Sequence, residues 1–213
     1  MRVFLAGAVL LAAHAAHADP FEAALDDVTQ GRHAAAAVAF HALADTGDAT
    51  AAHNLAVLFA LGKGVPQSHI EASYWALTAF LKGLNRAAPL SDALLAELSE
   101  RERIALAERL ETRFAPSAQS GDGPSMLALA IILALLRPVP DVVAAYSWQS
   151  IAAAIDTPGA ARAREQTRKM LPTDARPEAE AQAKAAFLAW CAGRADDAPA
   201  QCRLVTALAP IAR

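Results

Sequence analysis

Apolar residues recur along this chain with the spacing of amphipathic helices. Four of them, three and four positions apart, fall on one face of a helix: Ala52, Leu55, Ala56 and Phe59. The Gly-Lys-Gly-Val-Pro run at 62–66 ends that helix, because glycine accepts a positive φ and proline cannot continue a helix. Ser68 is the predicted N-cap of a second helix. No stretch alternates with a period of two, so the pattern predicts an all-α protein.

The same order of residues occurs twice. The Ala-x-x-Gly pair ending at Gly47 recurs at Gly121, and Leu55-Ala56 recurs as Leu129-Ala130, a shift of 74 residues in both cases. After the intervening turn the correspondence continues at a shift of 73 residues. Ser68, Ala72 and Trp75 correspond to Asp141, Ala145 and Trp148. The one-residue slip falls in a turn, where deletions are tolerated. A repeat of this length indicates stacked helical units.

The first copy, residues 44–83, resembles a Sel1-like repeat, a relative of the tetratricopeptide repeat. The positions that carry the resemblance are Ala44, Gly47, Ala52, Leu55, Ala56, Phe59, Gly62, Gly64, Val65, Ala72, Trp75, Ala79 and Gly83. The resemblance implies a right-handed α-α superhelix, a Sel1/TPR-like solenoid of stacked antiparallel helix pairs. The second copy, 118–156, departs from the pattern because its turn, Leu-Arg-Pro-Val-Pro at 136–140, lacks both glycines.

We expect one continuous domain over residues 19–213, since each repeat buries its apolar face only against a neighbour. Its units are a helical pair at about 20–47, the repeats at 44–83 and 118–156, helix pairs at 90–115 and 159–192, and a C-terminal helix at 199–211. Within the first of those later pairs, Ser99-x-x-Glu102 predicts a capping box that starts a charged helix.

The first eighteen residues have the features of a secretory signal peptide. Arg2 supplies a positive start, residues 3–13 are apolar, and Ala-His-Ala at 16–18 is a cleavage site. The alternative is a membrane anchor, but this run and the apolar run at 126–136 are both shorter than the ~20 residues a span needs. We therefore expect an exported, periplasmic protein with no stable membrane insertion after cleavage.

The cysteines and the charges narrow the function further. In an oxidising compartment, Cys191 and Cys202 are expected to form a disulfide, the alternative being two free buried thiols. The chain has 19 basic and 22 acidic residues, and acidic and basic side chains alternate along 100–113. That pattern is typical of a solvated helix face, not of a phosphate-binding stripe, so a nucleic-acid partner is not expected.

Catalytic and metal motifs are missing from the sequence. The histidines show no His-Glu-x-x-His or comparable ligand spacing, and there is no Gly-x-Ser-x-Gly elbow, phosphate loop or reactive-cysteine signature. We predict a protein that is not an enzyme, with no metal and no cofactor.

The resemblance places a protein-binding surface on the first helix of each repeat, which lines the concave side in Sel1-like proteins. Its residues are Thr50, His53, Asn54 and Val57 in the first copy and, in the second, Leu127, Ala128 and Ile131. The helix at 126–136 is apolar all round, so either the chain itself covers it or it forms a groove for a partner segment. The three tryptophans, Trp75, Trp148 and Trp190, are interpreted as core residues.

The expected function is therefore that of a periplasmic scaffold or adaptor that binds another protein. Two alternatives stay open at this point. One is an accessory structural component of an envelope machine for secretion, polysaccharide export or motility. The other, less favoured, is a hydrolase acting on the cell envelope.

Overall fold

The computed structural model describes residues 19–194 and 199–208, and within them the chain forms helices and no strand. The predicted signal peptide and the end of the predicted C-terminal helix lie outside these residues. The α-helices are α1 (Pro20–Thr29), α2 (His33–Asp45), α3 (Ala49–Leu61), α4 (His69–Leu81), α5 (Ala88–Ala96), α6 (Glu100–Gln119), α7 (Gly123–Ile131), α8 (Val142–Ala154), α9 (Ala160–Met170), α10 (Arg176–Ala192) and α11 (Ala200–Leu208). The all-α prediction is confirmed.

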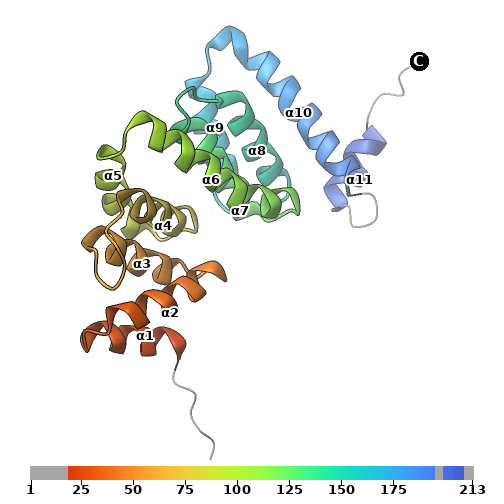
Figure 1. Ribbon diagram of the computed structural model, residues 1–213. Coiled ribbons are helices and arrows are strands. Elements are labelled where there is room, and N and C mark those ends of the chain that lie inside the picture. The colour runs from red at the N-terminus through yellow and green to blue at the C-terminus, as the bar shows by residue number, and fades with distance from the viewer. Residues whose placement is uncertain (1–18, 195–198, 209–213) are drawn as a thin grey trace, which may run out of the picture.

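The helices follow one another in an arch (Figure 1). Helices α1–α4 form one limb, α5–α9 the crown, and α10 with α11 the other limb. Most helices pack against the helices next to them in the chain, and α4 and α8 also contact the later helices α6 and α10, respectively. The interior is rich in alanine: Ala52 and Ala56 of α3 and Ala72 and Ala76 of α4 are completely buried. Small side chains at these contacts allow neighbouring helices to approach closely.

The turn after α2 and the turn after α6 have the same geometry. Gly47 and Gly121 occupy it with φ of 103° and 102°. The amide of the next residue, Asp48 or Asp122, donates to a carbonyl five residues earlier at 3.0 Å and 2.9 Å. This is the Schellman ending of a helix. The 74-residue repeat of the sequence is therefore a repeat of backbone conformation.

The helices α4 and α8 also end alike, although only the first ends on glycine. Gly83 follows α4 with φ of 95°, and Asp156 follows α8 with φ of 58°. The amides of Leu84 and Thr157 then donate to carbonyls five residues earlier, at 3.0 Å and 2.9 Å. The left-handed conformation is thus kept at position 156 without a glycine. Aspartate adopts this conformation at some cost, but it tolerates it better than most side chains do.

The turns inside the two repeats differ. Helix α3 ends at Leu61, and its C-cap Gly62 is left-handed with φ of 63°, as the sequence predicts. In the second copy the segment at 126–136 is helical, as predicted, but it is not a single α-helix: α7 ends at Ile131, and the π-helical turn η2 (Ile132–Leu136) follows directly. Because no glycine is available for a left-handed exit, the helix widens and leaves through extended Arg137. The amides of Ser68 and Asp141 nevertheless close both turns through equivalent bonds, at 3.1 Å and 2.9 Å.

Helix starts agree with the capping chemistry of the sequence. Ser68 caps α4 by accepting a hydrogen bond from the Glu71 amide. Ser99 and Glu102 form the predicted capping box at α6, where the hydrogen bonds from Ser99 hold the pKa of Glu102 below its ordinary value.

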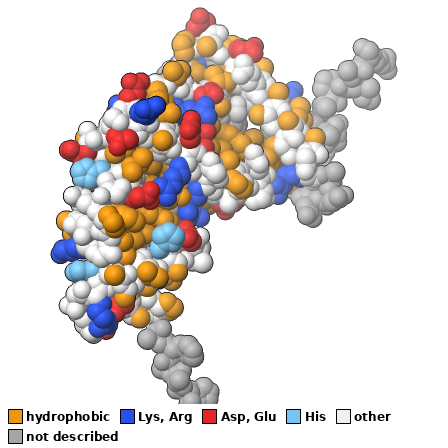
Figure 2. Space-filling view, in the orientation of Figure 1, with side chains coloured by type: hydrophobic (Ala, Val, Ile, Leu, Met, Phe, Trp, Pro, Cys, Tyr) orange, Lys and Arg blue, Asp and Glu red, His pale blue; other side chains and the backbone are white. Residues whose placement is uncertain are grey.

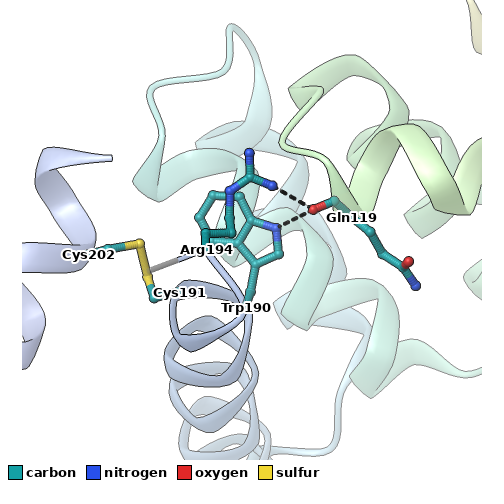
Figure 3. The surroundings of a disulfide bond; sticks show 5 residues. All are labelled: Gln119, Trp190, Cys191, Arg194 and Cys202. Atoms are coloured by element: carbon teal, nitrogen blue, oxygen red, sulfur yellow. Dashed lines mark hydrogen bonds between the residues drawn. A yellow bond between two sulfur atoms is a disulfide. The ribbon is translucent and has the colours of Figure 1, made fainter. Parts of the chain in front are cut away.

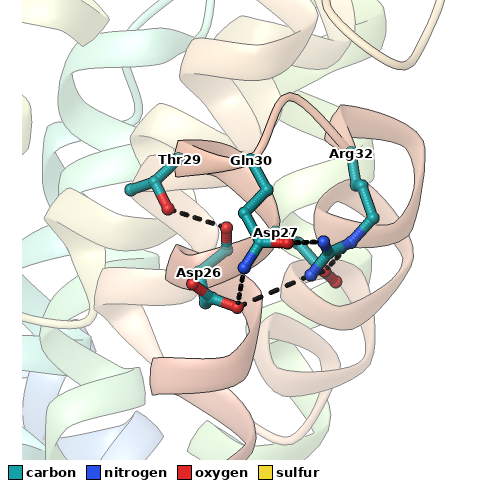
Figure 4. Close-up of polar contacts among 5 residues, drawn as sticks. All are labelled: Asp26, Asp27, Thr29, Gln30 and Arg32. Carbon is teal, nitrogen blue, oxygen red and sulfur yellow. Dashed lines mark hydrogen bonds and ion pairs between the residues drawn. The ribbon is translucent and has the colours of Figure 1, made fainter.

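Near the start of the described residues, polar side chains close the turn between α1 and α2 (Figure 4). Arg32 pairs with Asp27 and lies 3.5 Å from Asp26, while Gln30 donates to Asp26 at 2.6 Å.

Candidate protein-binding site

The predicted binding stripe on α3 is half-buried. Thr50, His53, Asn54 and Val57 are all of intermediate exposure. Burial, and after it the positive charge of Arg86 in the turn η1 (Asn85–Ala87), lowers the pKa of His53 below its ordinary value. Its Nδ1 atom is buried without a hydrogen-bond partner. The stripe therefore presents little free side-chain surface in this structure.

The predicted stripe on α7 is divided between two hydrophobic clusters. Ala128 is 1% exposed and belongs to the cluster built by α1–α6, against which the half-buried Ile131 also packs. Leu127 packs against the second cluster, which includes Met126 and residues of α8 and α10. Ala128 thus has no free surface, and the chain itself covers most of the 126–136 segment.

Within the 126–136 segment, Leu135 of η2 is an exception to this burial, because 66% of its surface is exposed.

An open hollow lies between α8 and α10, and we call it the tryptophan pocket. It has a volume of about 540 Å³, and its walls carry the indole rings of Trp148 and Trp190. The other lining residues are small apolar groups and a few polar ones: Val143, Ala144, Ile151, Ala186, Ala189, Gln119, Asp141, Ser147 and Gln182. Hydrophobic side chains gather on the surface between α8 and α10 in Figure 2.

The core interpretation of the tryptophans is confirmed for only one of the three. Trp75 is 2% exposed, whereas Trp148 and Trp190 are half-buried at the edge of the second cluster. The sequence feature that distinguishes the surroundings of Trp148 from those of Trp75 lies in α10. Gln182 and Ala186 stand there at the positions where α6 has Arg109 and Arg113. That difference becomes visible only when the two helices are aligned by their buried faces.

The C-terminal end of α10 is tied to the end of α6 (Figure 3). The indole N–H of Trp190 donates to the Gln119 carbonyl at 3.2 Å, and the Arg194 guanidinium donates to the same oxygen at 2.7 Å and to the Ser120 carbonyl. These are the carbonyls that a helix end leaves without partners. Gly121 leaves room for the guanidinium, because a Cβ there would lie 2.9 Å from Arg194 Nη2.

The predicted disulfide joins Cys191 at the end of α10 to Cys202 in α11 (Figure 3). Both cysteines are buried, at 8% and 3% exposure. The bond holds α11 beside α10, where Leu204, Phe187 and Tyr146 help to line a second apolar hollow of about 490 Å³. Helix α10 therefore has an apolar hollow on each side.

Residues 19–194 and 199–208 hold no group of three His, Cys, Asp or Glu side chains placed to hold a metal ion. No helix within those ranges is long and apolar enough to cross a membrane. A scan against models of known protein families found no match, and a search of the curated proteins found none either.

Proposed function

We propose that this protein is a non-catalytic, periplasmic scaffold or adaptor that binds another protein. The observation that carries the proposal is the open tryptophan pocket, about 540 Å³ in volume, beside a second apolar hollow on the same helix. Tryptophan is among the residues most enriched at the positions that contribute most to protein–protein binding. Apolar surface that the chain leaves uncovered marks such interfaces.

The proposed class is an exported Sel1-like repeat protein with a right-handed solenoid. Support comes from the repeated helix endings at Gly47 and Gly121 and from the paired order of helices α2–α3–α4 and α6–α7–α8. The disulfide between Cys191 and Cys202 supports export, since such bonds persist mainly in oxidising compartments. The pocket, more than the stripes on α3 and α7, is the proposed contact surface.

Site-specific photo-crosslinking in the native envelope tests the function. A photo-reactive amino acid replaces Gln182, which lines the pocket, or Thr50 on α3. Arg162 on the exposed side of α9 is the matched control position. We expect a discrete adduct of higher mass from position 182 and none from position 162. Absence of any adduct from positions 182 and 50, with the protein folded and present in the periplasmic fraction, contradicts the proposal.

A further inference from the structure

The helices α6 and α10 occupy equivalent places in the two halves of the molecule. In α6 the residues buried every fourth position are Leu106, Leu110, Phe114 and Ala118, and in α10 they are Ala179, Ala183, Phe187 and Cys191. Each residue of the second set follows its counterpart by 73 positions, the shift that also relates Trp75 to Trp148. Both helices contact the second helix of the preceding repeat, α4 or α8.

In the first half, arginine side chains of α6 cover the aromatic rings of α4. The Arg113 guanidinium lies 5.4 Å from the centre of the Trp75 ring and donates to the Ala44 carbonyl at 2.7 Å. Arg109 lies 3.7 Å from the centre of the Tyr74 ring. These contacts are cation–π interactions reinforced by charged hydrogen bonds.

Acidic side chains complete that arrangement. Glu71 accepts two hydrogen bonds from Arg109, at 2.5 Å and 3.0 Å. Asp45 lies 3.5 Å from Arg113. The first half therefore holds guanidinium groups between indole or phenol rings and carboxylates.

In the second half Trp148 stands at the position of Trp75, but the arginines and the acids that pair with them are absent: Ser147, Ala144 and Gln119 stand where the first half has Tyr74, Glu71 and Asp45. The pocket has an acid from another position, Asp141, which is the counterpart of Ser68. At the positions equivalent to Arg109 and Arg113, α10 carries Gln182 and Ala186. Both residues line the tryptophan pocket, together with Trp148 and the carboxylate of Asp141. The space that a guanidinium fills beside Trp75 is thus open beside Trp148.

Neither of the two neighbouring cations, Arg137 and Arg194, lines the pocket. Arg137 is bound by both carboxylate oxygens of Glu111, each at 2.6 Å. The hydrogen bonds of Glu111 and, after them, the charges of Glu111 and Asp141 raise the pKa of Arg137. Arg194 lies 4.8 Å from the Trp190 ring centre and donates to the carbonyls at the end of α6. The Asp141 carboxylate accepts one hydrogen bond, from the Ala144 amide, which uses a single one of its oxygens.

We infer that the tryptophan pocket receives an arginine side chain from a segment of the partner protein, with the guanidinium on the Trp148 ring and beside Asp141. This inference rests on the proposed protein-binding function and specifies its chemistry. The partner supplies in trans the group that α6 supplies in cis to the first half. Arginine fits because its planar cation both stacks on rings and pairs with carboxylates.

A titration followed by the three indole N–H signals in ¹H–¹⁵N spectra tests the inference. The probe is the capped tripeptide acetyl-Ala-Arg-Ala-amide, and the comparison probe carries citrulline, which has the same shape without the charge. We expect the signals of Trp148 and Trp190 to move with the arginine peptide while the buried Trp75 stays fixed. The citrulline peptide should bind about tenfold more weakly. Equal binding of the two peptides, or no movement at Trp148, overturns the inference.

A pair of variants gives an independent readout. Ala186→Arg places a guanidinium where α6 has Arg113, so it should fill the pocket and abolish the peptide-induced shifts. Ala185→Arg adds the same charge at an exposed position of α10 that does not line the pocket, and should leave binding unchanged.

The two proposals fail in different ways. Unchanged peptide binding in a folded Ala186→Arg protein overturns the arginine pocket, whereas the loss of every envelope adduct overturns the protein-binding function.

Discussion

Gly64 marks the place where the first repeat touches the helix pair before it. This glycine has φ of 74°, and a Cβ built on it would overlap the carbonyl carbon of His33 and the amide nitrogen of Ala34, both backbone atoms in the first turn of α2. Gly64→Ala therefore imposes two costs. A left-handed conformation costs a residue with a Cβ about 1 kcal/mol. Displacing a packed backbone costs a further ~1–3 kcal/mol.

We expect Gly64→Ala to lower the free energy of unfolding by about 2–4 kcal/mol, the sum of these terms. Gly83→Ala is the matched control, because Gly83 also has a positive φ, of 95°, but nothing lies within 4 Å of a Cβ there. It should lose only about 1 kcal/mol. Urea denaturation followed by far-ultraviolet circular dichroism measures both values. If the two variants lose equal stability, the turn between α3 and α4 does not sit against α2.

Three further predictions concern local chemistry. Burial lowers the pKa of His53, so the unfolded chain takes up a proton first as the pH falls below the ordinary value of 6.5. The free energy of unfolding should therefore decrease as the pH falls below that value, and it should decrease less in His53→Gln. If the free energy of unfolding changes equally with pH in the two proteins, this prediction is wrong. Replacing both Cys191 and Cys202 by alanine opens a loop that the disulfide closes across a sequence separation of 11. The free energy of unfolding should fall by about 3 kcal/mol, and an unchanged thermal midpoint would contradict this prediction. Arg194→Ala should destabilise the protein by about 1–2 kcal/mol in the same denaturation assay, because the Ser120 carbonyl loses its donor and the Gln119 carbonyl keeps only the Trp190 indole; Lys169→Ala, at an exposed position of α9, should have no such effect.

Features that depend on a few neighbouring residues were predictable from the sequence. The cap at Ser68, the box at Ser99 and Glu102, and the left-handed exit at Gly62 are local, and the structure has all three. The disulfide followed from cysteine count and spacing, since only two cysteines exist and few residues separate them.

The tryptophan pocket was not predictable in the same way. Trp75 and Trp148 occupy the same position in their repeats, and their surroundings differ because of residues on helices about forty positions further along the chain. Arg113 covers one ring and Ala186 leaves the other uncovered. The π turn at Ile132–Leu136 was also missed, because the missing glycine indicated a different turn without indicating its form.

The most direct test of the account combines the crosslinker at position 182 with the filled pocket. We predict that the adduct formed in the native envelope disappears when Ala186→Arg is added and persists when Ala185→Arg is added. Disappearance in the first variant alone means that the partner enters the space beside Trp148. An adduct of equal yield in both variants, with both proteins folded, contradicts the claim that this pocket is where the protein binds.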